Sequence, residues 1–235
     1  LFYKGREALT FALKSLDLPK ESTVAINGFT CVAVFNAIRK AGFEPLCLDL
    51  EETGGLNFTP KTLEKALKSN ENIKVVVVQN TLGYPCDIQT IQDICRKNDL
   101  ILIEDLAHCV GTRYSNGKEA GTVGDFVVLS FSQDKIIDAV SGGALIIRDN
   151  KLKKSERVGA KLIHPPGVYS IKDRFYPLET YKIRSAYKLG LGKPYHFVLK
   201  KLNLLSNVMN ESFYESYSLP SWHAGLTLYQ FDNLE

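Results

Sequence analysis

The spacing of apolar residues switches repeatedly between helical and strand-like patterns through the first hundred residues. Leu9, Ala12, Leu13 and Leu16 recur at helical spacing, which predicts a helix with one apolar face. Helical spacing of this kind predicts helices at 6–16, 32–41, from 60 onward and around 88–95. Short apolar runs, several of them rich in β-branched residues, predict strands at 23–27, 45–50, 75–78 and 100–103. Because parallel strands need a crossover between them, this alternation predicts an α/β domain of three layers, with a mostly parallel central sheet flanked by helices.

The pattern changes in the second half of the chain. Strand-like runs at 112–114, 126–129 and 144–148 are separated by glycine turns, which predicts a strand-rich end to the sheet. Residues 151–163 are compatible with a helix that ends before the prolines of 164–167. The basic, tyrosine-rich segment that follows is interpreted as an excursion from the core, and the chain ends in a helical pattern at 224–235.

Composition and charge narrow the class of protein. The 235 residues are 45% hydrophobic and 23% charged, as in ordinary globular proteins, and the net charge of +3 is spread along the chain, so no nucleic-acid partner is expected. The five cysteines occur singly, which favours reduced, buried thiols in a cytoplasmic protein. No signal sequence is visible and no apolar run reaches the ~18 residues of a membrane helix. We therefore expect no membrane insertion.

Two strand ends carry the most informative chemistry. Asp105 ends the apolar run 100–104, and Lys135 follows the run 126–131 before the glycine pair at 142–143. In α/β proteins ligands bind at the carboxyl ends of parallel strands. A lysine that forms a Schiff base and an acid that keeps a pyridine nitrogen protonated are what pyridoxal 5′-phosphate chemistry requires. The two residues therefore predict pyridoxal 5′-phosphate chemistry at this edge of the sheet.

Each of these residues also has an ordinary structural interpretation. A lysine after a strand is most often a solvated surface residue, and Asp105 alone would cap the turn that follows it. His108 is as well explained as a structural histidine as by a cofactor contact. Phosphate-binding candidates are Ser130 and the backbone N–H groups of Gly5, Arg6 and Glu7, because a glycine at a helix start leaves unpaired donors in a positive dipole.

Other classes of site are poorly supported. The four histidines have no close ligand spacing with each other or with a cysteine, so no metal is expected. The chain also lacks the G-x-S-x-G elbow that a Ser-His-Asp hydrolase would need.

The order of motifs resembles that of the DegT/StrS-type sugar aminotransferases, a branch of the fold-type I pyridoxal phosphate enzymes. Four blocks carry the resemblance, and the strongest is the fourth, in which residue types and spacings agree. The blocks are Gly5-Arg6-Glu7-Ala8-Leu9; 30–45 with Asp49; Gly83-x-Pro85-x-Asp87; and Glu104-Asp105-Leu106-Ala107-His108 with Gly111, Gly121, Gly124-Asp125, Ser130-Phe131, Lys135 and Gly142-Gly143.

The resemblance implies a role for each matching residue. Lys135 would be the cofactor-binding lysine and proton shuttle, Asp105 the partner of the ring nitrogen, and His108 the contact to the ring hydroxyl. Ser130 and the backbone of Gly5, Arg6 and Glu7 would hold the phosphate, and Cys31 stands where the family often has an aromatic ring stacked on the cofactor. Lysine at position 135 argues against the related sugar dehydratases, which carry histidine there.

The resemblance also implies a domain plan and an activity. We expect a cofactor-binding large domain at 1–150, an excursion of that domain at 151–223, and at 224–235 the start of a small C-terminal domain that is largely absent. The expected activity is transfer of an amino group from glutamate to a nucleotide-linked keto sugar, in a homodimer with a shared active site. The alternatives are another fold-type I reaction, on an amino acid or a lipid-linked substrate, and a non-catalytic binding protein that keeps the fold.

Overall fold

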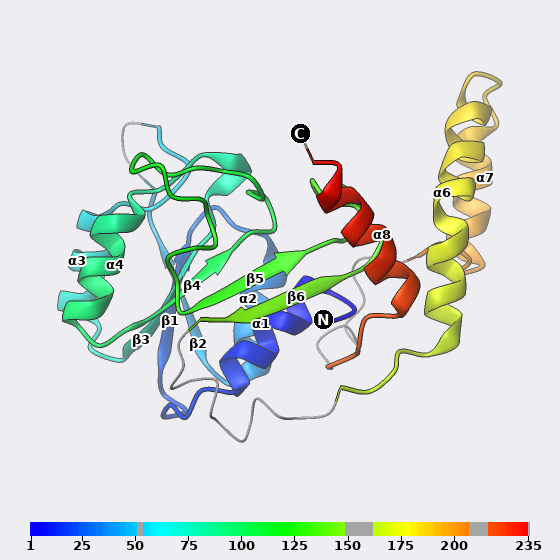
Figure 1. Ribbon diagram of the computed structural model, residues 1–235. Coiled ribbons are helices and arrows are strands. Elements are labelled where there is room, and N and C mark those ends of the chain that lie inside the picture. Colours follow the sequence, from blue (N-terminus) through cyan, green and yellow to red (C-terminus); the bar gives the residue numbers. More distant parts are fainter. Residues whose placement is uncertain (51–53, 149–161, 207–215, 235) are drawn as a thin grey trace.

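A six-stranded sheet forms the centre of the molecule, with helices on both faces (Figure 1). The computed structural model describes residues 1–50, 54–148, 162–206 and 216–234. The strands are β1 (Thr23–Asn27), β2 (Glu44–Leu48), β3 (Ile73–Val78), β4 (Ile101–Asp105), β5 (Phe126–Ser130) and β6 (Gly143–Ile147). The helices are α1 (Gly5–Lys14), α2 (Val32–Ala41), α3 (Pro60–Ser69), α4 (Ile88–Lys97), α6 (Gly167–Tyr187), α7 (Gly192–Lys201) and α8 (Ser221–Asp232).

The strand order is β2-β1-β3-β4-β5-β6, and only β6 pairs antiparallel with its neighbour. Alternate residues of each strand enter two separate cores. Val75 and Val77 of β3 pack with α1 and α2, whereas Val76 and Val78 pack with α3 and α4. A strand buried on both faces must be apolar at every position, which is why the β-branched run of β3 was a reliable strand signal.

Most of the predicted elements are confirmed, several with their bounds. The predicted strand 23–27 and helix 32–41 are β1 and α2, and the start of α3 is confirmed by the side chain of Thr59, which accepts a hydrogen bond from the Thr62 N–H at 3.2 Å. The three-layer arrangement with a mostly parallel sheet is also confirmed.

Two expectations need correction and one lies outside the described residues. The predicted strand 112–114 is wrong, because this stretch makes only an isolated bridge between Arg113 and Glu119 around a turn at Gly117. The five cysteines are all free, but Cys31 and Cys47 are exposed and not buried. The helix considered for 151–163 falls almost wholly outside the described residues.

The segment interpreted as an excursion is mostly helical. In Figure 1, α6 and α7 run side by side and stand away from the sheet, while α8 lies between them and the sheet. We predicted no helix here because α6 contains Pro177 and because its exposed apolar residues, although at helical spacing, do not pack into the core of the sheet. No helix in the described part of the chain is long and apolar enough to cross a membrane.

Candidate active site

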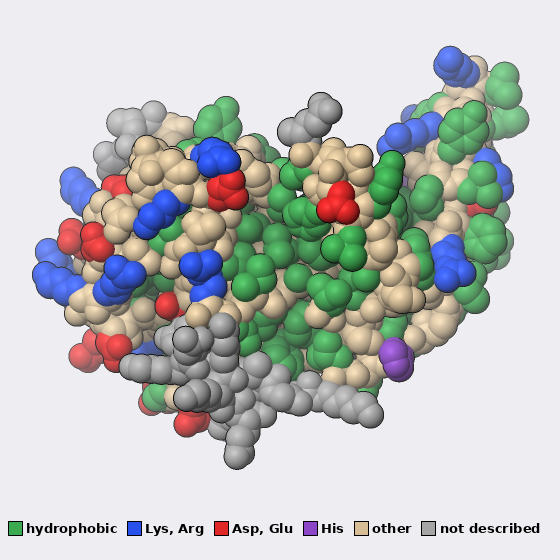
Figure 2. All heavy atoms as spheres, in the orientation of Figure 1, with side chains coloured by type: hydrophobic (Ala, Val, Ile, Leu, Met, Phe, Trp, Pro, Cys, Tyr) green, Lys and Arg blue, Asp and Glu red, His purple; other side chains and the backbone are tan. Residues whose placement is uncertain are grey.

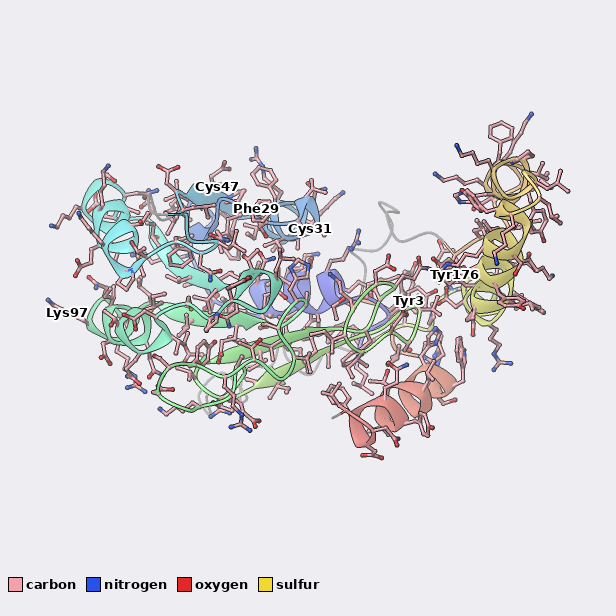
Figure 3. All side chains as sticks on the ribbon, turned by 90° about the horizontal axis from the view of Figure 1, so that it is seen from above. Tyr3, Phe29, Cys31, Cys47, Lys97 and Tyr176 are labelled. Atoms are coloured by element: carbon pink, nitrogen blue, oxygen red, sulfur yellow. The ribbon has the colours of Figure 1, made fainter. Side chains whose placement is uncertain are left out.

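A cavity of about 280 Å³ lies at the carboxyl ends of β4 and β5, beside the N-termini of α1 and α2. This edge of the sheet is where α/β proteins bind ligands. The cavity is lined by all but one of the candidate residues: Lys135, Asp105, His108, Ser130, Gly5, Arg6 and Cys31. Cys31 is exposed at the start of α2 (Figure 3). Glu7 is the exception, because its side chain is buried in the protein and does not line the cavity.

Lys135 lies in a tight loop between β5 and β6 that is held at several points. The loop contains Asp134 and Val140 in the left-handed region, at φ 63° and 65°. Gln230 of α8 holds it from the other side, because its amide oxygen accepts from the Asp138 N–H at 2.8 Å and its amide nitrogen donates to the Asp138 carbonyl at 2.7 Å. A helix from the far end of the chain thus fixes the loop that presents the Lys135 amine.

Asp105 is 4% exposed, so its carboxylate is largely removed from water. One oxygen accepts from the Ala107 N–H at 3.0 Å, so the turn-capping role considered from sequence is real. Burial raises the pKa of Asp105, whereas the Ala107 N–H and the charge of Lys135 lower it. Within the described ranges no cationic side chain lies within ion-pair distance of it. A protonated ring nitrogen in the cavity would supply the missing positive partner.

His108 lines the same cavity as Asp105 and is held there by a buried glutamine. The side-chain amide of Gln79 lies 3.4 Å from His108 Nδ1, and its oxygen accepts a hydrogen bond from the Thr30 hydroxyl. With the oxygen so occupied, the Gln79 amide nitrogen donates to Nδ1, which leaves the proton of a neutral imidazole on Nε2. Burial, and then the charge of Lys135, lower the pKa of His108 and favour this neutral form.

The third group of residues offers hydrogen-bond donors to an anion. Gly5 begins α1 directly against the end of β5, where an added Cβ would come within 2.8 Å of the Ser130 Cβ. The helix is ten residues long, so its N-terminus carries a partial positive charge. The N–H of Glu7 is already paired with the Lys4 carbonyl at 3.1 Å, which leaves Gly5 and Arg6 as the residues at the cavity.

Gln133 is a cavity residue that the sequence did not single out. Its side-chain nitrogen is buried and has no hydrogen-bond partner among the described residues. An unpaired buried amide costs free energy, so it fits a site whose ligand brings an acceptor, such as a phosphate oxygen. Its place between Ser130 and Lys135 was the only signal, and a glutamine in a loop is usually solvated.

Glu104 organises the loop behind the site. Its carboxylate is fully buried and accepts four hydrogen bonds, from the Tyr114 hydroxyl at 2.7 Å and from the N–H groups of Gly121, Val123 and Gly124 at 2.7, 2.8 and 2.5 Å. These contacts attach residues 114–124 to the end of β4. The acid beside Asp105 is therefore a structural residue that holds the loop following β4.

The residues after β3 proved to be structural. Asn80 adopts a left-handed conformation, donates to the Tyr114 hydroxyl at 2.8 Å and accepts from the Cys86 N–H at 2.9 Å. Asp87 caps α4 by accepting from the Thr90 N–H at 3.2 Å. Residues 80–87 thus form the connection between β3 and α4, which ends in the helix cap at Asp87. Within the described ranges, no cluster of three metal-ligating side chains occurs.

The burial of Glu7 in α1 predicts a pH dependence of the protein's stability that can be tested. Burial raises the pKa of Glu7 to about 9, against opposing effects of the Lys4 and Tyr217 N–H groups and the Lys4 charge. The folded protein therefore keeps a proton that the unfolded chain releases, so the free energy of unfolding falls as pH rises from 4.5 to about 9. We expect Glu7→Gln to be more stable than wild type by about 2 kcal/mol at pH 8 and by much less at pH 5.

Urea unfolding at the two pH values measures this difference, with Glu64→Gln on the exposed side of α3 as the control. The range stops at pH 8 because burial lowers the pKa of Lys4 to about 8, and its titration opposes that of Glu7 above this value. If Glu7→Gln changed the free energy of unfolding equally at pH 5 and pH 8, the raised pKa of Glu7 would be contradicted.

Comparison with known proteins identifies the family. A model of the DegT/DnrJ/EryC1/StrS aminotransferase family matches residues 3–184. The chain belongs to this family. It is 34% identical over 142 residues to the GDP-perosamine synthase of Vibrio cholerae, covering 60% of this chain and 38% of that protein. It is 31% identical over 153 residues to the dTDP-4-dehydro-2,3,6-trideoxy-D-glucose 4-aminotransferase of Saccharopolyspora spinosa, covering 65% and 39%.

Solved structures give the same result. The aminotransferase TlmJ of Streptoalloteichus hindustanus is 31% identical with a TM-score of 0.59, covering 66% of this chain and 42% of that one. An aminotransferase of Psychrobacter cryohalolentis is 30% identical with a TM-score of 0.60, covering 66% and 38%. The fold-type I large-domain fold is thereby confirmed. The chain spans about two fifths of the length of these relatives.

Proposed function

We propose that the protein is a pyridoxal phosphate-dependent aminotransferase that acts on a nucleotide-linked keto sugar. The observation that carries this proposal is the meeting, in one cavity, of the Lys135 amine, the buried Asp105 carboxylate and the N-terminus of α1. These groups come from three separate parts of the chain, and a surface lysine or a capping aspartate would not require the other two. Residues 1–150 would form the cofactor-binding unit.

The residues present fit the cofactor. Asp105 would hold the proton on the ring nitrogen, since a buried carboxylate gains most from a cationic partner. Neutral His108 would contact the ring hydroxyl, and Cys31 would lie against the ring. Gly5, Arg6, Ser130 and the unpaired amide of Gln133 would bind the phosphate.

When bound, pyridoxal phosphate supplies an electron sink for the electrons left on the substrate carbon after proton removal. Lys135 would hold the cofactor covalently through Nζ. As a free amine, the same nitrogen would act as general base and then general acid, taking a proton from the substrate carbon and later returning one. The contacts of Gln230 to the Lys135 loop would keep this amine in position.

The names of the relatives support the substrate class. The similar proteins include GDP-perosamine synthases and an aminotransferase named for a dTDP-linked keto sugar. We propose glutamate as the amino donor and a homodimer with a shared active site. The direct experiment is to incubate the cofactor-loaded whole protein with glutamate and a panel of keto-sugar nucleotides, and to detect the amino sugar by mass spectrometry.

Each result of that panel is informative. Formation of an amino-sugar nucleotide supports the proposal. Turnover of amino acids or of lipid-linked keto sugars alone would replace the sugar-nucleotide assignment with another fold-type I reaction. Failure of the protein to bind pyridoxal phosphate when it is loaded before the panel would favour the non-catalytic alternative.

Asp105→Asn is expected to lower kcat about a hundred-fold or more, because the amide cannot stabilise a positive ring nitrogen as the carboxylate does. The cofactor should remain covalently bound, since Lys135 is unchanged. Steady-state kinetics and the absorption of the bound cofactor check both parts. Asp93→Asn, on the exposed side of α4, is the matched control. Activity within about twofold of wild type would remove Asp105 from the mechanism.

A further inference from the structure

The helical hairpin, defined here as residues 167–203 with α6 and α7, projects from the body (Figure 1). Its two helices are firmly joined to each other. Glu179 of α6 accepts from the Lys182 ammonium at 2.8 Å and from the Tyr195 hydroxyl of α7. Gly192 lets the helices approach closely, since an added Cβ would come within 2.7 Å of the Ile183 carbonyl oxygen. The hairpin is therefore a rigid unit.

Among the described residues, the hydrogen bonds that join the hairpin to the body lie at its base. The buried carboxylate of Asp173 accepts from the Tyr3 hydroxyl at 2.6 Å and pairs with His223 Nε2 of α8 at 2.9 Å. Trp222 Nε1 donates to the Ser170 hydroxyl at 3.0 Å. Figure 3 shows Tyr3 beside α6 at this junction. From Asp173 to the end of α6 at Tyr187 the helix rises about 20 Å, which carries the tip away from these contacts.

The tip of the hairpin carries exposed apolar side chains. Leu189 and Leu191, in the loop between the helices, are 76% and 59% exposed, and Lys188 and Lys193 flank them. A separate exposed apolar stripe lies on the half of α6 nearer the base, where Val168, Ile171, Phe175 and Leu178 recur at helical spacing. Patches of this kind on an otherwise ordinary surface mark interaction sites. Figure 2 shows apolar and basic side chains side by side on this part of the molecule.

Charge decides which partner fits. The hairpin has eight lysine and arginine residues and two acidic ones, of which Asp173 is buried in the base. Its net charge is thus +6, whereas the whole chain has only +3, so the rest of the chain is net acidic. Two hairpins packed symmetrically against each other would bring like charges together. An anionic lipid surface instead complements the lysines and accepts the leucines.

We propose that the helical hairpin docks the protein on an anionic lipid bilayer by its tip. Leu189 and Leu191 enter the boundary between headgroups and acyl chains, and Lys188 and Lys193 contact lipid phosphates through their flexible stems. Exposed Tyr187 at the end of α6 lies at headgroup level, where aromatic side chains with a polar end are favoured. The arrangement places the protein on the membrane surface and not across it.

The test is flotation of the whole cofactor-loaded protein with vesicles of phosphatidylcholine alone or with about one third phosphatidylglycerol. We expect binding to the anionic vesicles only, weakened by added salt. Leu189→Glu combined with Leu191→Glu should lower the partition coefficient at least about tenfold. Lys188→Ala with Lys193→Ala should lower it about fivefold per lysine. Leu228→Glu on α8, which replaces an equally accessible leucine of the body, should leave binding unchanged.

Three outcomes would overturn the proposal: no flotation with either vesicle, equal binding to both, or equal loss in the tip and α8 variants. If the sedimentation coefficient falls in the tip variant while flotation is unchanged, the tip contacts a second copy of the chain. This outcome would also reject the proposal of membrane docking. Cofactor absorption and thermal unfolding, measured on the same samples, report folding and the active site separately. Failure of docking therefore leaves the proposed aminotransferase function untouched.

Discussion

Replacing Lys135 with alanine is expected to remove covalent cofactor attachment and to lower aminotransferase activity by about a thousand-fold or more. The reason is that Lys135 is the cavity's one lysine among the described residues and serves as both the attachment point and the proton carrier. Lys135→Arg should be equally inactive, because a guanidinium keeps the charge but forms no such linkage. Absorption spectra of the reconstituted protein and single-turnover kinetics measure the two losses.

The control for this prediction is Lys97→Ala, at the end of α4 far from the cavity (Figure 3). Its spectrum and rate should match those of the wild type. If Lys135→Ala kept the absorption of a covalently bound cofactor, another amine would hold it and the assignment of the catalytic residue would be wrong.

The largest expected effect on stability comes from Glu104→Ala, at about 3–5 kcal/mol of unfolding free energy. The substitution leaves three N–H groups and the Tyr114 hydroxyl without the carboxylate that accepts from them. Loss of a buried, multiply bonded charged acceptor is among the costliest of single substitutions. Urea denaturation followed by circular dichroism measures the change.

Two further variants separate this mechanism from a general sensitivity of the loop. Glu104→Gln keeps one acceptor oxygen and should lose less stability than Glu104→Ala. Glu119→Ala removes an exposed carboxylate from the same loop, where its pair with Arg113 contributes about 1 kcal/mol or less. A Glu104→Ala protein as stable as the Glu119→Ala protein would contradict the role given to Glu104.

The sequence predicted the sheet and its helices because their signals are local. The valine run of β3 and the Thr59-Pro60 helix start specify their elements within a few residues. The same locality explains why Lys135 and Asp105 could be placed at one edge, since Asp105 ends β4 and Lys135 follows the end of the parallel neighbour β5 by five residues. Their resemblance to a family motif then gave each residue a role.

The features that the sequence did not predict depend on contacts between distant segments. Gln133 gained significance only when its amide proved to be buried and unpaired, and Gln230 only when α8 was found against the Lys135 loop. The role of Asp173 was visible only in the structure, where its carboxylate pairs with Tyr3 and His223 at the base of the hairpin. The hairpin itself was missed because its apolar residues face outward, and their helical spacing in α6 was not recognised in a segment that contains Pro177.

The central claim is that a covalent bond to the Lys135 side chain holds the cofactor. Its most direct test is reduction of the cofactor-loaded protein with borohydride, followed by proteolysis and peptide mass mapping. We expect the reduced cofactor mass on the peptide that contains Lys135, and loss of that label in Lys135→Ala. A label on any other lysine, or no label in a protein that binds the cofactor, would contradict the claim.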